Sequence, residues 1–273
     1  MSTEQTRQPM DPAVVDKLLD RLSSDDEYRE LFAKDPRAAL EQVGHKVPSD
    51  DAMACARTET LASKEEIAQA RKLLADHLTD QAAKAYATVL LCLKGSVCLY
   101  QGEELGLPEA DVPFEQLRDP YGITFWPNFK GRDGCRTPMP WTADAGAGFS
   151  TGTPWLPIPD AHRARSVAAQ EADDGSVLAA ARRFLHWRRA RPALVVGDQQ
   201  FLDAPEPVLA SVRSHDGARV LAVFNLASTP VDWPLPDGVL GARALDGHGL
   251  AGAVIDAGVV RLPPHGVLFA DVD

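Results

Sequence analysis

Residues 99–141 read LYQGEELGLPEADVPFEQLRDPYGITFWPNFKGRDGCRTPMPW, and this stretch decides how the fold is interpreted. The apolar run from Val97 to Tyr100 predicts a buried strand, which ends just before two adjacent carboxylates, Glu103 and Glu104. The loop that follows is rich in proline and aromatic residues, and its charged motif holds Arg132, Asp133 and Arg136. A strand that leads charged residues into a stiff aromatic loop is typical of the pocket rim of an α/β barrel.

Short motifs continue this pattern in a fixed order. They are YQGEELG at 100–106, DP at 119–120, GRDGCRTPMPW at 131–141, GFS at 148–150 and PWL at 154–156. In this order and spacing they resemble the α-glucosidases of glycoside hydrolase family 13, of the oligo-1,6-glucosidase-like kind. The resemblance runs from about Ala82 to the C-terminus, and it covers only the last part of such an enzyme.

The resemblance implies that Arg136, and with it Arg132, binds an α-glucoside or a malto-oligosaccharide. A guanidinium suits this role because it donates paired hydrogen bonds. A loop-bracing ion pair is the alternative for both residues, and for Arg132 the partner would be Asp133. The residues expected to support the pocket rim are Tyr100, Glu103, Glu104 and Asp133. The tryptophans expected to pack within the loops, rather than to serve as sugar platforms, are Trp126, Trp141 and Trp155.

The same resemblance implies three catalytic carboxylates that the sequence does not supply. Family 13 enzymes use a nucleophile and an acid/base carboxylate about 5 Å apart, with a third aspartate in an Asn-His-Asp motif upstream of the position of Tyr100. No Asn-His-Asp occurs in the sequence. Glu103 and Glu104 cannot replace the pair, because adjacent side chains on an extended segment point to opposite faces. We therefore predict no catalytic residue, and no α-glucosidase activity from the chain alone.

Composition excludes several other classes of function. The net charge is −11 without any run of Lys or Arg, which argues against a nucleic-acid partner. No apolar run approaches the roughly 20 residues that cross a bilayer, and the first residues lack the apolar core of a secretory signal. The cysteines form no C-x-x-C pair, and Cys92 and Cys98 lie in apolar runs that predict buried thiols. We expect a cytoplasmic protein with no metal, no cofactor and no membrane partner.

The first 80 residues predict a helical segment. The helix-start signals are Asp11-Pro12, Ser24 with Glu27, Asp35-Pro36 and Ser63 with Glu66. No Gly or Pro occurs between Ser63 and Lys94, so the last of these helices is expected to run unbroken into the enzyme-like part.

The N-terminal segment also resembles a second family. LSSDDEYR at 22–29, Phe32, DPRAAL at 35–40 and Gly44 are similar to nitrile-hydratase-like leader peptides, and LASKEEI at 61–67 looks like the later part of one such group. The resemblance implies a precursor-like substrate whose residues 1–80 dock a peptide-modifying enzyme. The double-glycine cleavage site common in such leaders is absent. A small helical accessory module is the alternative.

These patterns together predict an α+β chain of three parts. Residues 1–80 form the helical leader-like segment, and residues 81–192 a C-terminal remnant of a (β/α)8 glucosidase barrel that ends in a helix from Val177 to Arg191. Residues 193–273 form an antiparallel β-sandwich, with strands at Val208–Arg213, Arg219–Asn225 and Val267–Val272. A lone barrel strand exposes both its edges, so the remnant is not expected to pack as it does in the enzyme.

Overall fold

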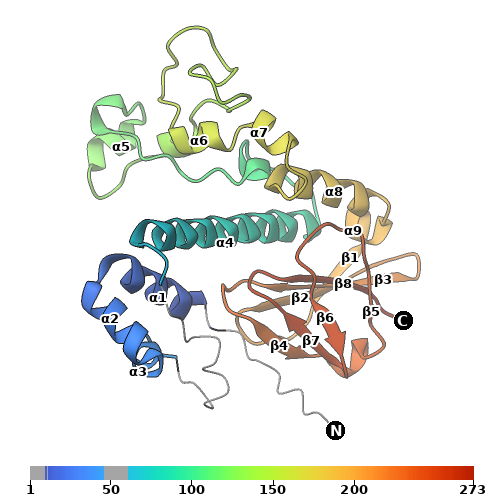
Figure 1. Ribbon diagram of the computed structural model, residues 1–273. Coiled ribbons are helices and arrows are strands. Elements are labelled where there is room, and N and C mark those ends of the chain that lie inside the picture. The colour runs from blue at the N-terminus through green and yellow to red at the C-terminus, as the bar shows by residue number, and fades with distance from the viewer. Residues whose placement is uncertain (1–9, 11, 46–60) are drawn as a thin grey trace. The chain divides into compact units, whose positions relative to one another are not determined.

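The computed structural model describes residue 10 and residues 12–45 and 61–273. The chain divides into two compact units, Met1–Leu78 and Thr79–Asp273. One long helix runs through the division (Figure 1). Each unit has a hydrophobic core of its own. The three-part division expected from the sequence, with boundaries at residues 80 and 192, stays a prediction.

The first unit is helical. Its elements are α1 (Pro12–Ser24), α2 (Asp26–Lys34), α3 (Pro36–Gln42) and the beginning of α4 (Lys64–Cys92). Their apolar sides meet around Tyr28 and Phe32 of α2, with Leu40 of α3 and Ile67 of α4. The Tyr28 hydroxyl donates a 2.6 Å hydrogen bond to the Ala39 carbonyl, so the buried ring also satisfies its polar atom.

Two predicted helix starts are confirmed. The Asp35 carboxylate accepts the Ala38 N–H at 3.0 Å and caps α3. Before α4, the Ser63 N–H donates to Glu66 at 2.8 Å and the Glu66 N–H donates to the Ser63 hydroxyl at 3.1 Å. The predicted continuity of α4 is also confirmed over its 29 residues. Within residues 12–45 and 61–273, no helix is both long enough and apolar enough to cross a membrane.

The predicted cap at Ser24 is wrong. Ser24 ends α1, and its hydroxyl donates to the Asp20 carbonyl at 2.8 Å. Asp25 caps α2 instead, because its carboxylate accepts the Tyr28 N–H at 2.9 Å. A carboxylate one position later therefore takes the role that the serine pattern predicted. Asp11, the other predicted cap, lies outside the described residues.

Between α4 and the sheets the chain consists of short helices and loops. The elements are η2 (Glu103–Leu105), η3 (Phe114–Gln116), α5 (Pro120–Phe125), η4 (Asp133–Cys135), α6 (Asp160–Ala164), α7 (Val167–Glu171), α8 (Val177–Arg189) and α9 (Pro192–Val196). The amphipathic helix predicted from Val177 is confirmed as α8, with Leu178 and Phe184 buried.

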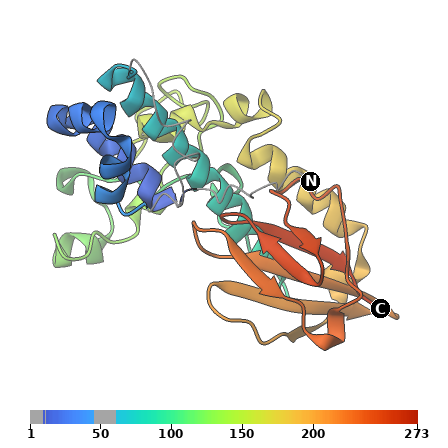
Figure 2. The ribbon, with the colours of Figure 1, turned by 60° about the horizontal axis from the view of Figure 1, so that its bottom comes forward.

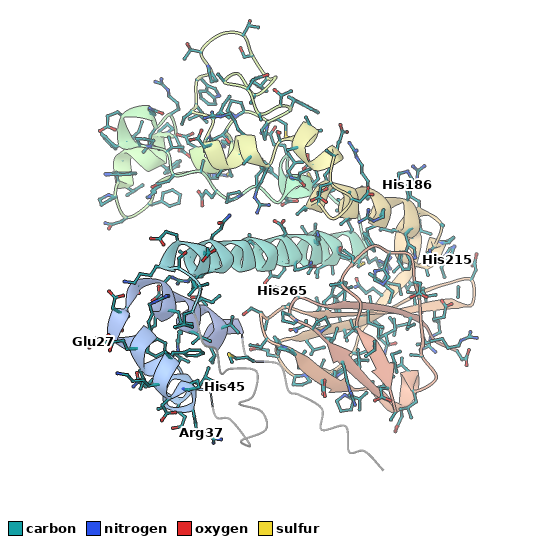
Figure 3. All side chains as sticks on the ribbon, viewed as in Figure 1. Glu27, Arg37, His45, His186, His215 and His265 are labelled. Carbon is teal, nitrogen blue, oxygen red and sulfur yellow. The ribbon has the colours of Figure 1, made fainter. Side chains whose placement is uncertain are left out.

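The helix α4 also contacts the C-terminal part of the chain. The ring of His265 meets the Tyr86 ring of α4 edge-on, with ring centroids 6.1 Å apart (Figure 3).

The C-terminal part forms two antiparallel sheets (Figure 2). Their strand orders are β1-β2-β3-β8-β5 and β4-β7-β6. The strands are β1 (Asp198–Phe201), β2 (Val208–His215), β3 (Ala218–Asn225), β4 (Val231–Pro234), β5 (Arg243–Ala244), β6 (Val254–Asp256), β7 (Val259–Leu262) and β8 (Val267–Asp271). The three strands predicted from alternation are confirmed as β2, β3 and β8. A tight turn at Asp216 and Gly217 joins β2 to β3, with φ of 48° and 83°. No closed barrel forms among the described residues.

The larger sheet is buried on both faces. Along β3, Leu221 and Val223 contribute to a core shared with the smaller sheet. Val220, Ala222 and Phe224 contribute instead to a second core shared with α4, α8 and α9. The period-two alternation of β3 therefore divides its apolar side chains between two cores, which explains why the strand reads as continuously hydrophobic.

The prediction of a buried strand at Val97 to Tyr100 is wrong. These residues belong to neither a helix nor a strand, although their burial still alternates. Val97 and Leu99 are half-buried against the second core, whereas Cys98 and Tyr100 are exposed. A strand needs a neighbour that accepts and donates backbone hydrogen bonds, and the described part of the chain places none beside this run. Cys98 is consequently exposed rather than buried as predicted.

Candidate functional site

The charged motif of the long loop is built on Asp119. This residue is the N-cap of α5, where one carboxylate oxygen accepts the Tyr121 N–H at 3.0 Å. The other oxygen accepts the Arg132 N–H at 2.9 Å, and the side chain is buried. The DP motif therefore both starts a helix and holds the turn that carries the arginines.

Asp133 is the second anchor of the motif. Its Oδ2 accepts the N–H of Arg118 at 2.5 Å and the N–H of Asp119 at 2.7 Å. Asp133 is 1% exposed, and its Oδ1 has no hydrogen-bond partner among the described residues. The backbone at Gly134 passes so close to the Ala110 carbonyl that a Cβ at this position would lie 2.4 Å from it, so only glycine fits without a shift. Asp133 thus binds backbone across the loop, and the local pairing with Arg132 considered above does not form.

Arg136 lies beside the turn that Asp119 and Asp133 hold. Its Nη1 is 3.8 Å from Asp119 Oδ2, and its side chain is 38% exposed. The guanidinium is therefore held at one side and open at the other. The N–H groups of Arg132 and Tyr121 hold the pKa of Asp119 below its usual value, and the positive charges of Arg136 and Arg132 add to this effect. An ionised Asp119 is what fixes the motif at neutral pH.

The predicted rim residues Glu103 and Glu104 form a local turn rather than an extended segment. Glu103 accepts the Tyr100 N–H at 3.1 Å, and Glu104 accepts the Gly102 N–H at 2.8 Å. They belong to η2, which is flanked by Gly102 and Gly106 in the left-handed conformation, with φ of 95° and 61°. The assumption of an extended backbone was wrong because these glycines fold the chain back on itself. Both carboxylates are occupied in capping backbone N–H groups.

The two loops of the site are tied together by residues that the sequence analysis did not single out. Gln101 donates to the Thr137 carbonyl at 3.3 Å. His162 is buried, with Nδ1 3.0 Å from the Thr137 hydroxyl and Nε2 2.7 Å from the Pro108 carbonyl. A lone histidine in a short helix carries no sequence signal for such a bridge. These hydrogen bonds hold the YQGEELG turn and the RTPMPW turn against each other.

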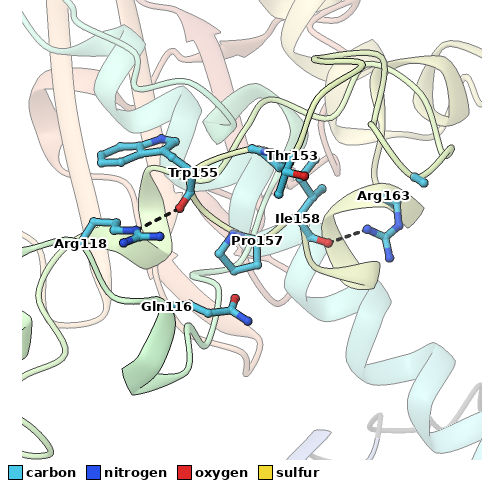
Figure 4. A pocket seen from close by; sticks show the side chains of 9 residues that line it. Gln116, Arg118, Thr153, Trp155, Pro157, Ile158 and Arg163 are labelled. Atoms are coloured by element: carbon cyan, nitrogen blue, oxygen red, sulfur yellow. Dashed lines mark hydrogen bonds between the residues drawn. The ribbon is translucent and has the colours of Figure 1, made fainter.

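A cavity of about 400 Å³ opens between Arg118 and the loop at residues 153–163 (Figure 4). Arg118 Nε donates to the Trp155 carbonyl at 3.4 Å, and Arg163 Nη1 donates to the Ile158 carbonyl at 2.6 Å. The remaining lining residues are Gln116, Ala145, Thr153, Pro154 and Pro157. None of the predicted site residues lines this cavity.

The predicted packing of the tryptophans is wrong for two of the three. Trp155 is 62% exposed and Trp141 is 50% exposed. Trp126 contacts Phe114, with ring centroids 5.6 Å apart, and Lys130 lies 5.7 Å from its ring. The loop therefore presents aromatic rings to solvent.

The thiols of the second unit differ in burial. Burial raises the pKa of Cys92 to about 12, so this buried residue is a neutral thiol, as expected. Cys135 is exposed and its Sγ lies 3.1 Å from the Arg132 carbonyl. Across the described residues, no three His, Cys, Asp or Glu side chains gather with metal-binding geometry.

Comparison with known proteins agrees with the motif. The family model described as alpha amylase, catalytic domain, matches residues 60–197, so the match starts upstream of Ala82. A probable alpha-glucosidase of Rhizobium meliloti (strain 1021) is 48% identical over 198 residues, which are 72% of this chain and 35% of that protein. An oligo-1,6-glucosidase of Heyndrickxia coagulans is 31% identical over 176 residues, covering 58% of this chain and 32% of that one.

A solved structure gives the same picture. The alpha-glucosyl transfer enzyme XgtA superposes with a TM-score of 0.69 and 50% identity, over 71% of this chain and 36% of that one. The chain thus spans about a third of the length of the proteins that it matches. Because the model of the α-amylase catalytic domain matches about half of its residues, the chain belongs to that family.

Proposed function

We propose that the chain supplies the C-terminal part of an α-glucoside-acting enzyme and does not hydrolyse glucosides alone. The observation that carries this proposal is the half-exposed Arg136 guanidinium, held by a buried and ionised Asp119. The relatives named above are α-glucosidases and an α-glucosyl transfer enzyme, which supports an α-glucoside or malto-oligosaccharide as the ligand. In this proposal residues 81–192 are the barrel remnant, residues 193–273 are a supporting β-sandwich, and the setting is the cytoplasm.

Arg136 donates hydrogen bonds to the hydroxyl groups of the innermost sugar, and Arg132 contributes from the same turn. Tyr100, Glu103 and Glu104 keep the first loop in place, and Asp133 does the same for the second. None of these residues acts on the glycosidic bond. Both glutamates already accept backbone N–H groups, so neither is placed as a free nucleophile.

Hydrolysis of 4-nitrophenyl α-D-glucopyranoside by the purified chain tests the absence of activity. We expect a rate equal to that of buffer, because the carboxylate pair that the reaction needs is missing. The Rhizobium meliloti relative serves as the positive control. A rate above buffer that disappears in Glu103→Gln or Glu104→Gln would overturn the proposal.

Titration with maltose, followed by tryptophan fluorescence, tests the role of Arg136. We expect a saturable change in the millimolar range for the unaltered chain, and at least about tenfold weaker binding for Arg136→Met. Arg189→Met, which alters an exposed arginine at the end of α8, is the matched control and should bind as the unaltered chain does. A flat titration, or equal binding by Arg136→Met, rejects sugar binding at this motif.

We propose a second function for the first unit alone: residues 1–80 dock a peptide-modifying enzyme. The observation in favour is its own core around Tyr28 and Phe32, which lets the helices present a defined surface. The test is retention of the full chain on an immobilised modifying enzyme that acts on nitrile-hydratase-like leaders. A leader of that kind should displace it, and absence of retention would sink this candidate.

A further inference from the structure

Residues 175–197 are strongly basic, although the chain as a whole is acidic. They include five arginines and one histidine but no aspartate or glutamate, whereas the net charge of the chain is −11. Most of this segment is the helix α8, which ends at Arg189. Cations in the last turn of a helix offset its dipole. The dipole does not explain Arg182 and Arg183, which lie in the middle of the helix.

The basic side of α8 forms one wall of a hollow of about 490 Å³. The loop between β5 and β6 forms another wall and contributes Gly247, whose φ of 82° is left-handed. In the same loop, a Cβ at Gly249 would lie 2.6 Å from Arg183 Nε, so the loop passes directly against that arginine. We call this site the arginine hollow. No carboxylate lines it, and its side chains include Arg182, Arg183, His186, Trp187 and Arg191.

Two guanidinium groups of the arginine hollow are balanced by carbonyl dipoles alone. Arg183 donates to the Asp174 carbonyl at 2.8 Å, and Arg191 donates to the Trp187 carbonyl at 2.9 Å. Within the described parts of the chain, Arg182 is the one lining arginine that forms an ion pair, with Glu171 at 2.8 Å. Both partners of that pair are about half exposed, so the pair is weak. The hollow therefore holds positive charge that the protein does not neutralise.

Arg191 is already oriented for a ligand. Its guanidinium carbon lies 3.8 Å from the centroid of the Trp187 ring. Trp187 is fixed in turn, because its Nε1 donates to the Asp246 carbonyl at 2.8 Å and the His248 ring meets it edge-on. Burial lowers the pKa of Arg191, and the negative charge of Asp271 acts in the opposite direction. A cation that is partly dehydrated and held in one orientation loses little further freedom when it binds an anion.

We propose that the arginine hollow binds a phosphorylated small molecule through Arg183 and Arg191, with Arg182 as a third donor. A guanidinium matches phosphate oxygens in pairs, and its charge strengthens each hydrogen bond. Three arginines favour a phosphate over a carboxylate, because a phosphate carries up to about two negative charges. The volume suits a diphosphate or a phosphorylated sugar rather than a large cofactor. The arginine hollow shares no residue with the Arg136 motif, and its ligand goes beyond the proposed function.

A nucleic acid fits the arginine hollow less well. Such a polymer extends past any single hollow, and the net charge of −11 repels it over the rest of the surface. Binding of a nucleic acid is therefore the competing outcome of the test.

Isothermal titration calorimetry of the full chain with inorganic pyrophosphate tests the site. In about 100 mM sodium chloride we expect one site per chain, with a dissociation constant below about 1 mM. A second titration with glucose 6-phosphate distinguishes the source of the phosphate. Tighter binding of the sugar phosphate assigns the hollow to a phosphorylated sugar, and the reverse order assigns it to a diphosphate. No saturable heat from either ligand, or tighter binding of a single-stranded oligonucleotide, overturns the proposal.

Matched variants locate the binding. Arg183→Gln and Arg191→Gln should each weaken pyrophosphate binding at least about tenfold, because each removes a charge-assisted donor. Arg189→Gln removes the same charge from the same helix outside the hollow and should stay within about twofold. Thermal melting without ligand shows whether each variant is folded. If Arg191→Gln is not, Arg191→Lys keeps the charge without the paired donors and should still lose about threefold. Equal affinity of Arg183→Gln and Arg189→Gln would reject the hollow as the site.

This result is separable from that of the proposed function. Arg183→Gln should bind maltose as the unaltered chain does, because it leaves Asp119 and Arg136 in place. Pyrophosphate binding without maltose binding would reject the role of Arg136 and support the arginine hollow.

Discussion

A single buried arginine joins three elements of the second unit. Arg213 of β2 is fully buried, and its guanidinium donates to the carbonyls of Cys92 at 2.6 Å and Gly197 at 2.8 Å, with a longer contact to Leu194 at 3.3 Å. Cys92 ends α4 and Gly197 follows α9, so one side chain satisfies carbonyls at two helix ends. The charge itself is balanced by these dipoles rather than by a carboxylate.

Arg213→Met should lower the free energy of unfolding by about 2–4 kcal/mol, because the buried carbonyls lose their donors while the apolar volume is nearly kept. Urea unfolding followed by near-UV circular dichroism measures this change. Arg243→Met on the exposed β5 is the control and should stay within about 0.5 kcal/mol of the unaltered chain. Equal losses in the two variants would contradict the role given to Arg213.

Asp119 should make stability depend on pH. Its folded pKa lies below the unfolded value, so its contribution is present above the unfolded pKa and is lost as pH falls through the folded pKa. The gap in urea midpoint between the unaltered chain and Asp119→Asn should therefore be full at pH 7 and shrink below about pH 4. A gap of constant size from pH 7 to pH 2.5 would show that ionisation of Asp119 does not contribute.

At the residue scale, the sequence indicated the arginines but not what holds them. Arg136 belongs to a recognisable motif, whereas Asp119 and His162 act through partners distant in the chain. His162, for example, contacts Pro108 across 54 positions. Such pairings depend on the path of the loop, and no local pattern of residues encodes that path.

Among the elements, those with a long local period were predictable. The helix α4 and the strands β2, β3 and β8 follow from spacing alone, since each repeats an apolar position over several turns or pairs. The run at residues 97–100 also alternates, but a strand is defined by its neighbours. Its alternation survives in the structure while its pairing does not, and this is why the prediction failed there.

The N-cap of α3 offers a test on one helix. Asp35→Ala should cost about 0.5–2 kcal/mol, because the Ala38 N–H loses its acceptor. Native-state hydrogen exchange should then show the α3 amides exchanging about 2- to 30-fold faster. Glu41→Ala, an exposed change in the same helix, is the control. Unchanged exchange in Asp35→Ala would mean that packing alone holds α3.

At the scale of the whole molecule, the larger sheet contributes to both main cores of the second unit, because its central strands are buried on both faces. Leu221 is fully buried between the two sheets. Leu221→Ala should lower the free energy of unfolding by about 2–5 kcal/mol, from lost burial and from the cavity left behind. Thermal melting checks this, with Val254→Ala on the exposed side of β6 as the control. A comparable drop in both variants would place the main core elsewhere.

The different exposure of the thiols has a practical consequence. Cys92 is sealed in the core, while Cys98 projects from the run that has no backbone partner. An alkylating reagent at neutral pH would thus label the exposed Cys98 and Cys135 and leave the buried Cys92 unreacted. Loss of labelling at Cys98, with labelling of Cys135 unchanged, would therefore report any contact that covers residues 97–99.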